Sequence, residues 1–166
     1  NFLDVLQNFT VFEPVDGRII KKIPRYQQFR AVHKTIERIK TGKTRKDKGG
    51  VIWHTQGSGK SLTMVFLTIK MRRDPILRHY KLVFLTDRTQ LDTQLTATFT
   101  NTQKETIHHA DSVKSLKEML ARDSSDVITA MVQKFQESAD DFDFPVLNES
   151  EKIIVLADEA HRTQYG

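Results

Sequence analysis

The chain has 166 residues, of which 38% are hydrophobic and 28% charged, which is typical of a single globular domain. It contains no cysteine, which excludes a disulfide framework and a cysteine-based zinc site and favours a cytoplasmic setting. No apolar run approaches the roughly 18 residues of a membrane span and no signal peptide opens the chain, while the net charge of +5 favours a polyanionic partner.

The chain is expected to comprise a lead-in segment, residues 1–24, and one domain, residues 25–166. Because the segment begins without methionine, it is interpreted as the continuation of a preceding domain. Basic residues gather from Arg18 to Arg30 and again from Lys40 to Lys48. Such clusters are usually solvated faces, and here they are also compatible with a polyanion.

Apolar residues recur at helical spacing from Phe29 to Ile39, which predicts a helix that begins near Tyr26 and stops near Gly42. The stretch 41–50 is rich in glycine and lysine and is predicted to be a flexible surface loop. The next apolar run, Val51–Trp53, is predicted to be the first buried strand.

A phosphate-binding loop follows this run. Glycines at 57 and 59 allow backbone N–H groups to approach phosphate oxygens closely. Lys60 supplies a charge to the β- and γ-phosphates, and Ser61 offers a hydroxyl to Mg²⁺ at the positive end of the next helix. The strict pattern of such loops has glycine where this chain has His54, and the match alone also fits a glycine-serine turn with a solvated lysine.

The rest of the chain alternates between strands and helices. Strands are predicted at 82–86, 106–108, 127–132 and 153–157, and helices at 61–72, 89–99 and 112–121. Because helices separate the strands, the crossovers favour a parallel sheet. The predicted fold class is α/β, a three-layer P-loop (RecA-like) domain with a mainly parallel sheet, incomplete at its C-terminal side.

Two carboxylates, Asp158 and Glu159, follow the last predicted strand directly. The carboxyl ends of parallel strands form the ligand crevice of open α/β sheets. There Asp158 suits Mg²⁺ binding through water, and Glu159 suits the orientation and deprotonation of a water that attacks the γ-phosphate. The pair alone also fits a solvated strand end, but its combination with the phosphate loop favours nucleotide hydrolysis.

Five stretches, taken in chain order, resemble one family: Arg25–Val32, Trp53–Ser61, Leu85–Gln94, Gln133–Phe135 and Asp158–Arg162. Together they resemble the first motor domain of superfamily 2 helicases and, more narrowly, the R (restriction) subunit of type I restriction enzymes, an ATP-driven DNA translocase. The resemblance runs along nearly the whole chain. It implies a RecA-like fold, ATP and Mg²⁺ as cofactors, and double-stranded DNA with methylase and specificity subunits as partners.

The resemblance also implies roles for individual residues. Gln28, with Arg25 before it, matches the adenine-reading glutamine, while Arg88 and Gln94 match a motif that grips a DNA backbone. His161 matches the residue that links the ATP site to the partner domain. The positions that match the phosphate loop are Gln56, Gly57, Ser58, Gly59, Lys60 and Ser61.

The chain ends before the second RecA-like domain, which in this family supplies the arginine finger. It contains no [DE]xK triplet, so the lysine-bearing half of a PD-(D/E)xK nuclease is missing. We therefore expect the parent protein to be an ATP-dependent type I site-specific deoxyribonuclease, and this fragment alone to be inactive.

Three alternatives stay open at this point. A DEAH-type RNA helicase shares Asp158–His161 but normally carries Gly-Glu-Thr where this chain has His54, Thr55 and Gln56. A small-molecule P-loop kinase would need an arginine-bearing lid and an acceptor pocket. A non-catalytic nucleotide-binding module would bind ATP without hydrolysing it.

Overall fold

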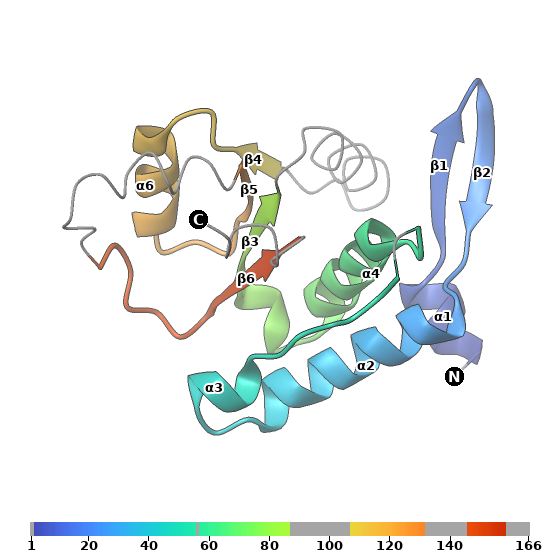
Figure 1. Ribbon diagram of the computed structural model, residues 1–166, viewed down its shortest axis with the longest axis horizontal. Helices are drawn as coiled ribbons and strands as arrows, with labels where there is room; N and C mark the ends of the chain where they lie inside the picture. Colours follow the sequence, from blue (N-terminus) through green and yellow to red (C-terminus); the bar gives the residue numbers. More distant parts are fainter. Residues whose placement is uncertain (1, 56, 87–106, 132–145, 159–166) are drawn as a thin grey trace. The chain divides into compact units, whose positions relative to one another are not determined.

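The computed structural model of the protein describes residues 2–55, 57–86, 107–131 and 146–158 (Figure 1). The described residues fall into two compact units, the first within residues 2–78 and the second within residues 79–158. Over the described ranges, no helix is long and apolar enough to cross a membrane.

The first unit is mainly helical and carries one hairpin. Its elements are α1 (Phe2–Asn8), β1 (Val11–Val15), β2 (Arg18–Lys22), α2 (Tyr26–Thr41), α3 (Arg45–Lys48) and α4 (Lys60–Arg73). A short 3-10 helix, η1 (Leu77–His79), follows α4 at the boundary between the units.

The core of the first unit lies where α2 and α4 pack against each other, with α1 resting on α4 (Figure 1). The buried side of α2 is the predicted stripe of Val32, Ile36 and Ile39. Phe9, which is fully buried, joins the elements because its ring centroid lies 4.8 Å from that of Phe29 and 5.5 Å from that of Phe66. Such aromatic contacts stabilise a core beyond the burial of area alone.

The carboxylate of Asp4 fastens α1 to both long helices. Its Oδ2 lies 2.7 Å from Nε2 of His33 in α2, and its Oδ1 accepts a hydrogen bond of 2.6 Å from Nζ of Lys70 in α4. Burial alone would raise the pKa of Asp4, but the hydrogen bonds from Lys70 and Asn8 hold this pKa below its ordinary value of 3.8. Since the pKa is depressed in the folded state, this stabilisation is complete above the ordinary pKa and is lost as the pH falls through the folded-state pKa.

The strands β1 and β2 form an antiparallel hairpin whose register pairs Val11 with Lys22 and Val15 with Arg18. Asp16 and Gly17 connect them with φ values of 49° and 74°. A two-residue turn with both φ values positive matches the twist of the strands, and Asp-Gly is one of its preferred sequences. Residues 1–24 therefore contain a helix and a hairpin, and their origin in a preceding domain stays a prediction.

The second unit is built around a parallel sheet. Its elements are β3 (Lys81–Thr86), β4 (Ile107–His109), α6 (Val113–Ala121), β5 (Val127–Met131) and β6 (Ile153–Ala157). The sheet has four strands in the order β4-β5-β3-β6, and every neighbouring pair runs parallel. The predicted α/β class with a parallel sheet is confirmed.

Burial in this sheet follows strand position. The two inner strands, β3 and β5, are almost wholly buried, which agrees with their unbroken apolar sequences. Leu116 of α6 packs with Ile128 and Ala130 of β5 on one face. The edge strand β6 is more exposed.

Two predictions for the first unit were wrong. Val51–Trp53 forms no strand, and the side chains of Val51 and Trp53 are 89% and 86% exposed. A strand needs a hydrogen-bonded neighbour, and none pairs with this run among the residues that the structure describes. The stretch 41–50, predicted to be a loop, contains the helical turn α3, because Thr44 and Asp47 cap each other's backbone N–H groups.

Other predictions hold. The helices predicted at 26–39, 61–72 and 112–121 are observed within two residues of their predicted ends, as are the strands predicted at 82–86, 106–108, 127–132 and 153–157. The helix predicted at 89–99 lies outside the described residues.

Lys81 anchors the end of α6 at the start of β3. Its side chain is almost fully buried, with the residue 2% exposed. The Nζ atom donates hydrogen bonds to the carbonyl oxygens of Met119, at 2.6 Å, and Leu120, at 3.1 Å, and also to that of Arg122. The last carbonyls of a helix have no partner within the helix and carry partial negative charge. A buried ammonium at this end therefore donates the hydrogen bonds that water would donate to exposed carbonyls.

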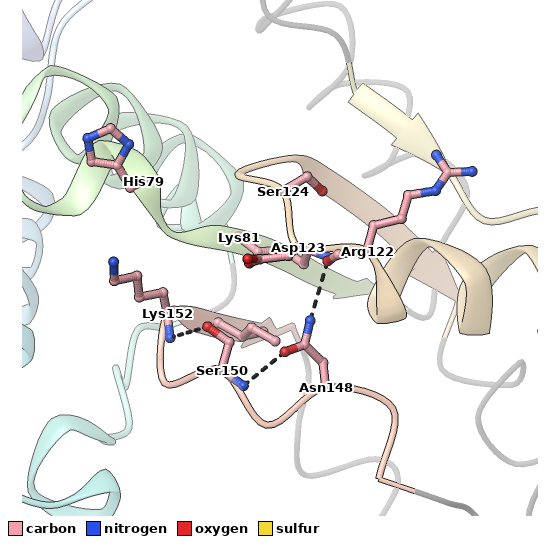
Figure 2. Close-up of a pocket in the computed structure, with 9 residues that line it drawn as sticks. His79, Lys81, Arg122, Asp123, Ser124, Asn148, Ser150 and Lys152 are labelled. Atoms are coloured by element: carbon pink, nitrogen blue, oxygen red, sulfur yellow. Dashed lines mark hydrogen bonds between the residues drawn. The ribbon is translucent and has the colours of Figure 1, made fainter.

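Burial lowers the pKa of Lys81, while the charges of Asp126 and Asp123 act in the opposite direction. Figure 2 shows the small pocket beside this lysine, where Asn148 bonds to the carbonyl of Arg122 at 3.3 Å. Its volume of about 30 Å³ suits one water molecule rather than a substrate. The pocket lies at the first residues of β3 and β6, away from the carboxyl ends of the strands.

We predict that Lys81→Met destabilises the second unit by about 1–3 kcal/mol, because the stem is kept while the carbonyl of Met119 loses its side-chain donor and those of Leu120 and Arg122 keep only the Asn148 amide. Chemical denaturation followed by circular dichroism measures the change. Lys114→Met, on the exposed side of α6, is the matched control and should change stability by less than about 0.5 kcal/mol. Equal stability of the two variants would refute the anchoring role.

Candidate nucleotide-binding site

The chain turns tightly between Thr55 and Lys60 before it enters α4. The N–H of Ser58 bonds to the carbonyl oxygen of Thr55 at 3.2 Å. Gly57 and Gly59 have φ values of 75° and 83°, in the left-handed region that favours glycine. Both glycines therefore have a conformational reason to stand where they do.

The helix α4 begins at the end of this turn. Lys60 is its first residue, Ser61 its second, and Gly59 forms the N-cap. The N–H of Thr63 bonds to the carbonyl oxygen of Gly59 at 3.1 Å and closes the first turn. The first backbone N–H groups of a helix have no intrahelical partners and attract anions, which makes this end suited to phosphate.

Gln28 joins the start of α2 to the loop. Its side-chain Nε2 donates to the carbonyl oxygens of Gly59, at 2.9 Å, and Ser58, at 3.3 Å. Its Oε1 accepts a hydrogen bond of 2.8 Å from the N–H of Arg25. The residue is only 3% exposed, and both hydrogens of its amide are used within the protein.

The position of Gln28 also explains why residue 59 has no side chain. A Cβ at Gly59 would lie 2.6 Å from Nε2 of Gln28, whereas a Cβ at Gly57 would meet nothing within 4 Å. Glycine at 59 thus suits both the positive φ and the close approach of the Gln28 side chain, which would have to shift to admit a Cβ.

Two buried polar atoms beside the loop have no hydrogen-bond partner in the described part of the chain, Oγ of Ser58 and Nδ1 of His54. A buried polar group without a partner destabilises a fold by roughly 1–3 kcal/mol and calls for an explanation. A phosphate oxygen would accept a hydrogen bond from the Ser58 hydroxyl, so these residues fit a nucleotide phosphate.

Asp158 lies at the carboxyl end of β6 in the second unit. Its N–H bonds to the carbonyl oxygen of Leu85 at 2.9 Å, which continues the pairing of β6 with β3. This edge of a parallel α/β sheet is where such folds bind ligands. In the described ranges, no group of three or more His, Cys, Asp or Glu side chains gathers that could hold a metal ion by itself.

The structure thus describes only some of the site residues that were predicted from the sequence. Arg25, Gln28, Gly57, Ser58, Gly59, Lys60 and Ser61 belong to the first unit, and Asp158 belongs to the second. The predicted residues that lie outside the described ranges are Gln56, Arg88, Gln94, Glu159 and His161.

Two features of this site were not predicted from the sequence. His54 was considered only as a departure from the usual glycine, although within the described residues its Nδ1 is buried without a hydrogen-bond partner. The contact of Gln28 with the loop was not predicted either, because 30 residues separate Gln28 from Ser58 and only the packing of α2 on α4 brings them together.

Comparison with known proteins identifies relatives along the whole chain. The model of the SWI2/SNF2 ATPase family matches residues 27–166. The chain is 38% identical over 175 residues to the type I restriction enzyme HindI endonuclease subunit of Haemophilus influenzae, covering 100% of this chain and 16% of that protein. It is 36% identical over 171 residues to the putative type I restriction enzyme MjaIXP endonuclease subunit of Methanocaldococcus jannaschii, again covering 100% of this chain and 16% of the relative.

A shorter relative is covered almost completely. It is the C-terminal part of the putative type I restriction enzyme MpnIIP endonuclease subunit of Mycoplasma pneumoniae, which is 30% identical over 178 residues, with 99% of this chain and 82% of that protein covered.

We predict that Gly59→Ala destabilises the first unit more than Gly57→Ala. Both substitutions place alanine at a positive φ, which destabilises by roughly 1–2 kcal/mol, but only the Cβ at 59 collides with Gln28. Thermal unfolding of the two variants measures the difference. Gln28→Ala should remove that difference in a double-mutant cycle, and equal losses for both glycines would contradict the close approach.

Proposed function

This chain belongs to the SWI2/SNF2 ATPase family, and we propose that it is the ATP-binding motor part of a type I restriction endonuclease R subunit. In the parent protein this motor uses ATP hydrolysis to translocate double-stranded DNA before cleavage by a nuclease domain outside this chain. The observation that carries the proposal is the loop of Gly57 and Gly59 at the start of α4, beside the Ser58 hydroxyl, which has no hydrogen-bond partner among the described residues. The names of the relatives support the restriction system.

The phosphate end of the nucleotide is assigned to the loop. Lys60 places a positive charge at the start of α4, where helix N–H groups also face an anion. Ser58 donates its hydroxyl, which no described residue engages, to a phosphate oxygen. Ser61 and Asp158 are the residues that would hold Mg²⁺, which when bound neutralises charge that develops on the phosphates.

The base end of the nucleotide is assigned to Gln28, with Arg25 beside it. Because both amide hydrogens of Gln28 bond to the loop carbonyls, adenine can engage this amide as a donor only if one of those bonds is exchanged. Gln28 therefore connects recognition of the base with the conformation of the phosphate loop.

The remaining roles rest on the resemblance of the motifs. Glu159 orients the attacking water and accepts its proton, while Arg88 and Gln94 contact the DNA backbone. His161 links the nucleotide site to the second motor domain, and Gln56 completes the phosphate loop. The proposed partners are duplex DNA and the methylase and specificity subunits, in the cytoplasm.

Stimulation by nucleic acid separates this proposal from the alternatives. Duplex DNA should raise the ATPase rate of the full-length parent, whereas RNA should not. Stimulation by RNA alone would favour a DEAH-type helicase, and a parent without any ATPase activity would favour a non-catalytic module.

We predict that Lys60→Ala in the full-length parent abolishes ATP hydrolysis and translocation while leaving the fold intact. Loss of a charge-assisted contact to phosphate weakens binding by about 1.5–3 kcal/mol before any effect on the transition state. ATP turnover and nucleotide affinity are measured beside Lys43→Ala, which removes an exposed lysine of the same unit. Normal turnover of Lys60→Ala would disprove the assignment of the phosphate loop.

We predict different defects for two variants of the acidic motif. Glu159→Gln should keep nucleotide affinity but lose turnover, because the amide preserves size and removes the base. His161→Ala should keep part of the basal ATPase rate and lose much of its stimulation by duplex DNA. The test is the ATPase rate of each parent variant with and without duplex DNA; equal fractional losses of the basal and stimulated rates in His161→Ala would refute the coupling role.

A further inference from the structure

We propose that the hairpin of β1 and β2 is a contact site for duplex DNA, separate from the backbone grip assigned to Arg88 and Gln94. The inference rests on the proposed function, since it requires a parent that moves duplex DNA. It assigns a role to the basic stretch 18–30, which the nucleotide site leaves unused in large part.

Both faces of the hairpin carry cations. Side chains alternate between the faces of a strand, so the register places Arg18 and Lys22 on one face and Lys21 on the other. Lys22 forms an ion pair with Glu13 across the strands. Arg18 and Lys21 have no carboxylate partner within the described residues and are exposed, so their charges are available to a polyanion.

Exposed apolar groups share the face that carries Lys21. Phe12, directly opposite Lys21, is 51% exposed, and Ile19, opposite Pro14, is 76% exposed. Figure 1 shows the hairpin extending away from α1 and α2, the helices next to it in the chain. Apolar side chains that are this exposed are available for contact with a ligand.

The distribution of charge favours DNA over a protein partner. A hairpin face that docks on protein would concentrate its lysines on the opposite, solvated face, because protein interfaces are depleted in lysine. A two-stranded ribbon in the major groove, which is about 12 Å wide, has phosphates along both sides and base edges with methyl groups beneath it. Cations on both faces, with Phe12 and Ile19 beside Lys21 on one of them, match that environment.

The hairpin is also connected to the nucleotide site through its own unit. β2 ends three residues before Arg25, and Gln28 in the first turn of α2 bonds to the carbonyl of Gly59. A force on the hairpin from bound DNA therefore acts on the segment that leads directly into Gln28.

The test measures how duplex binding by the full-length parent depends on salt. A fluorescent duplex is titrated, without nucleotide, at several salt concentrations with wild type and with the double variant Arg18→Ala and Lys21→Ala. Each lost phosphate contact should lower the slope of log affinity against log salt by about 0.9, so the double variant should lose about 1.8. The control, Lys43→Ala with Lys46→Ala, removes two exposed lysines of the same unit and should leave the slope unchanged.

A charge-preserving variant, Arg18→Lys with Lys21→Arg, guards against misfolding and should keep the wild-type slope. An unchanged slope in the alanine variant, or an equal loss in the control, would overturn the proposal, as would loss of assembly with the partner subunits at an unchanged slope. A parent that hydrolyses ATP with duplex stimulation but shows no slope change refutes the hairpin site alone. A wild-type parent that binds no duplex refutes the proposed function as well.

Discussion

The hydrogen bonds from the Gln28 amide to the carbonyls of Ser58 and Gly59 are the contacts on which the shape of the candidate site depends. These hydrogen bonds stabilise a loop that lacks the hydrogen bonds of a helix or strand, since Gly57 and Gly59 both adopt positive φ. Gln28 can make them because α2 packs along α4, the helix that the loop opens. Packing of two helices thus fixes the backbone of a turn, and the turn sets the direction of the N–H groups offered to phosphate.

The same logic extends from the loop toward the N-terminus. α1 contributes no buried residue of its own, yet Asp4 bonds to both α2 and α4, and the ring of Phe9, just after α1, fills the space among them. Polar contacts at the rim and one aromatic ring in the core therefore fix the relative position of the two helices that carry Gln28 and the phosphate loop. The lead-in segment is in this sense part of the support of the nucleotide site.

Sequence predicted the elements whose signal is local. The apolar stripe of α2 and the unbroken apolar runs of β3 and β5 predict which residues are buried. The glycine spacing of the loop predicts its backbone conformation. The strand prediction for Val51–Trp53 was wrong because apolar composition favours burial but does not provide the hydrogen-bonded neighbour that a strand requires. The hairpin and α3 were not predicted, although Asp16-Gly17 and the capping pair of Thr44 and Asp47 are local signals for them. The contact of Gln28 with the loop has no local signal, because it depends on tertiary packing.

In the parallel sheet of the second unit, the stabilising contacts of Lys81 and the acidic motif lie at opposite ends of the strands. At the amino ends, the buried ammonium of Lys81 satisfies three carbonyls at the end of α6, and the adjoining pocket is too small for a substrate. At the carboxyl ends, the backbone of Asp158 is bonded to Leu85, which places the start of the acidic motif beside the end of β3. Since the four strands of this sheet run in the same direction, their carboxyl ends all lie on one side of the unit. A carboxylate on that side can bind a ligand, while the residues at the amino ends stabilise the fold.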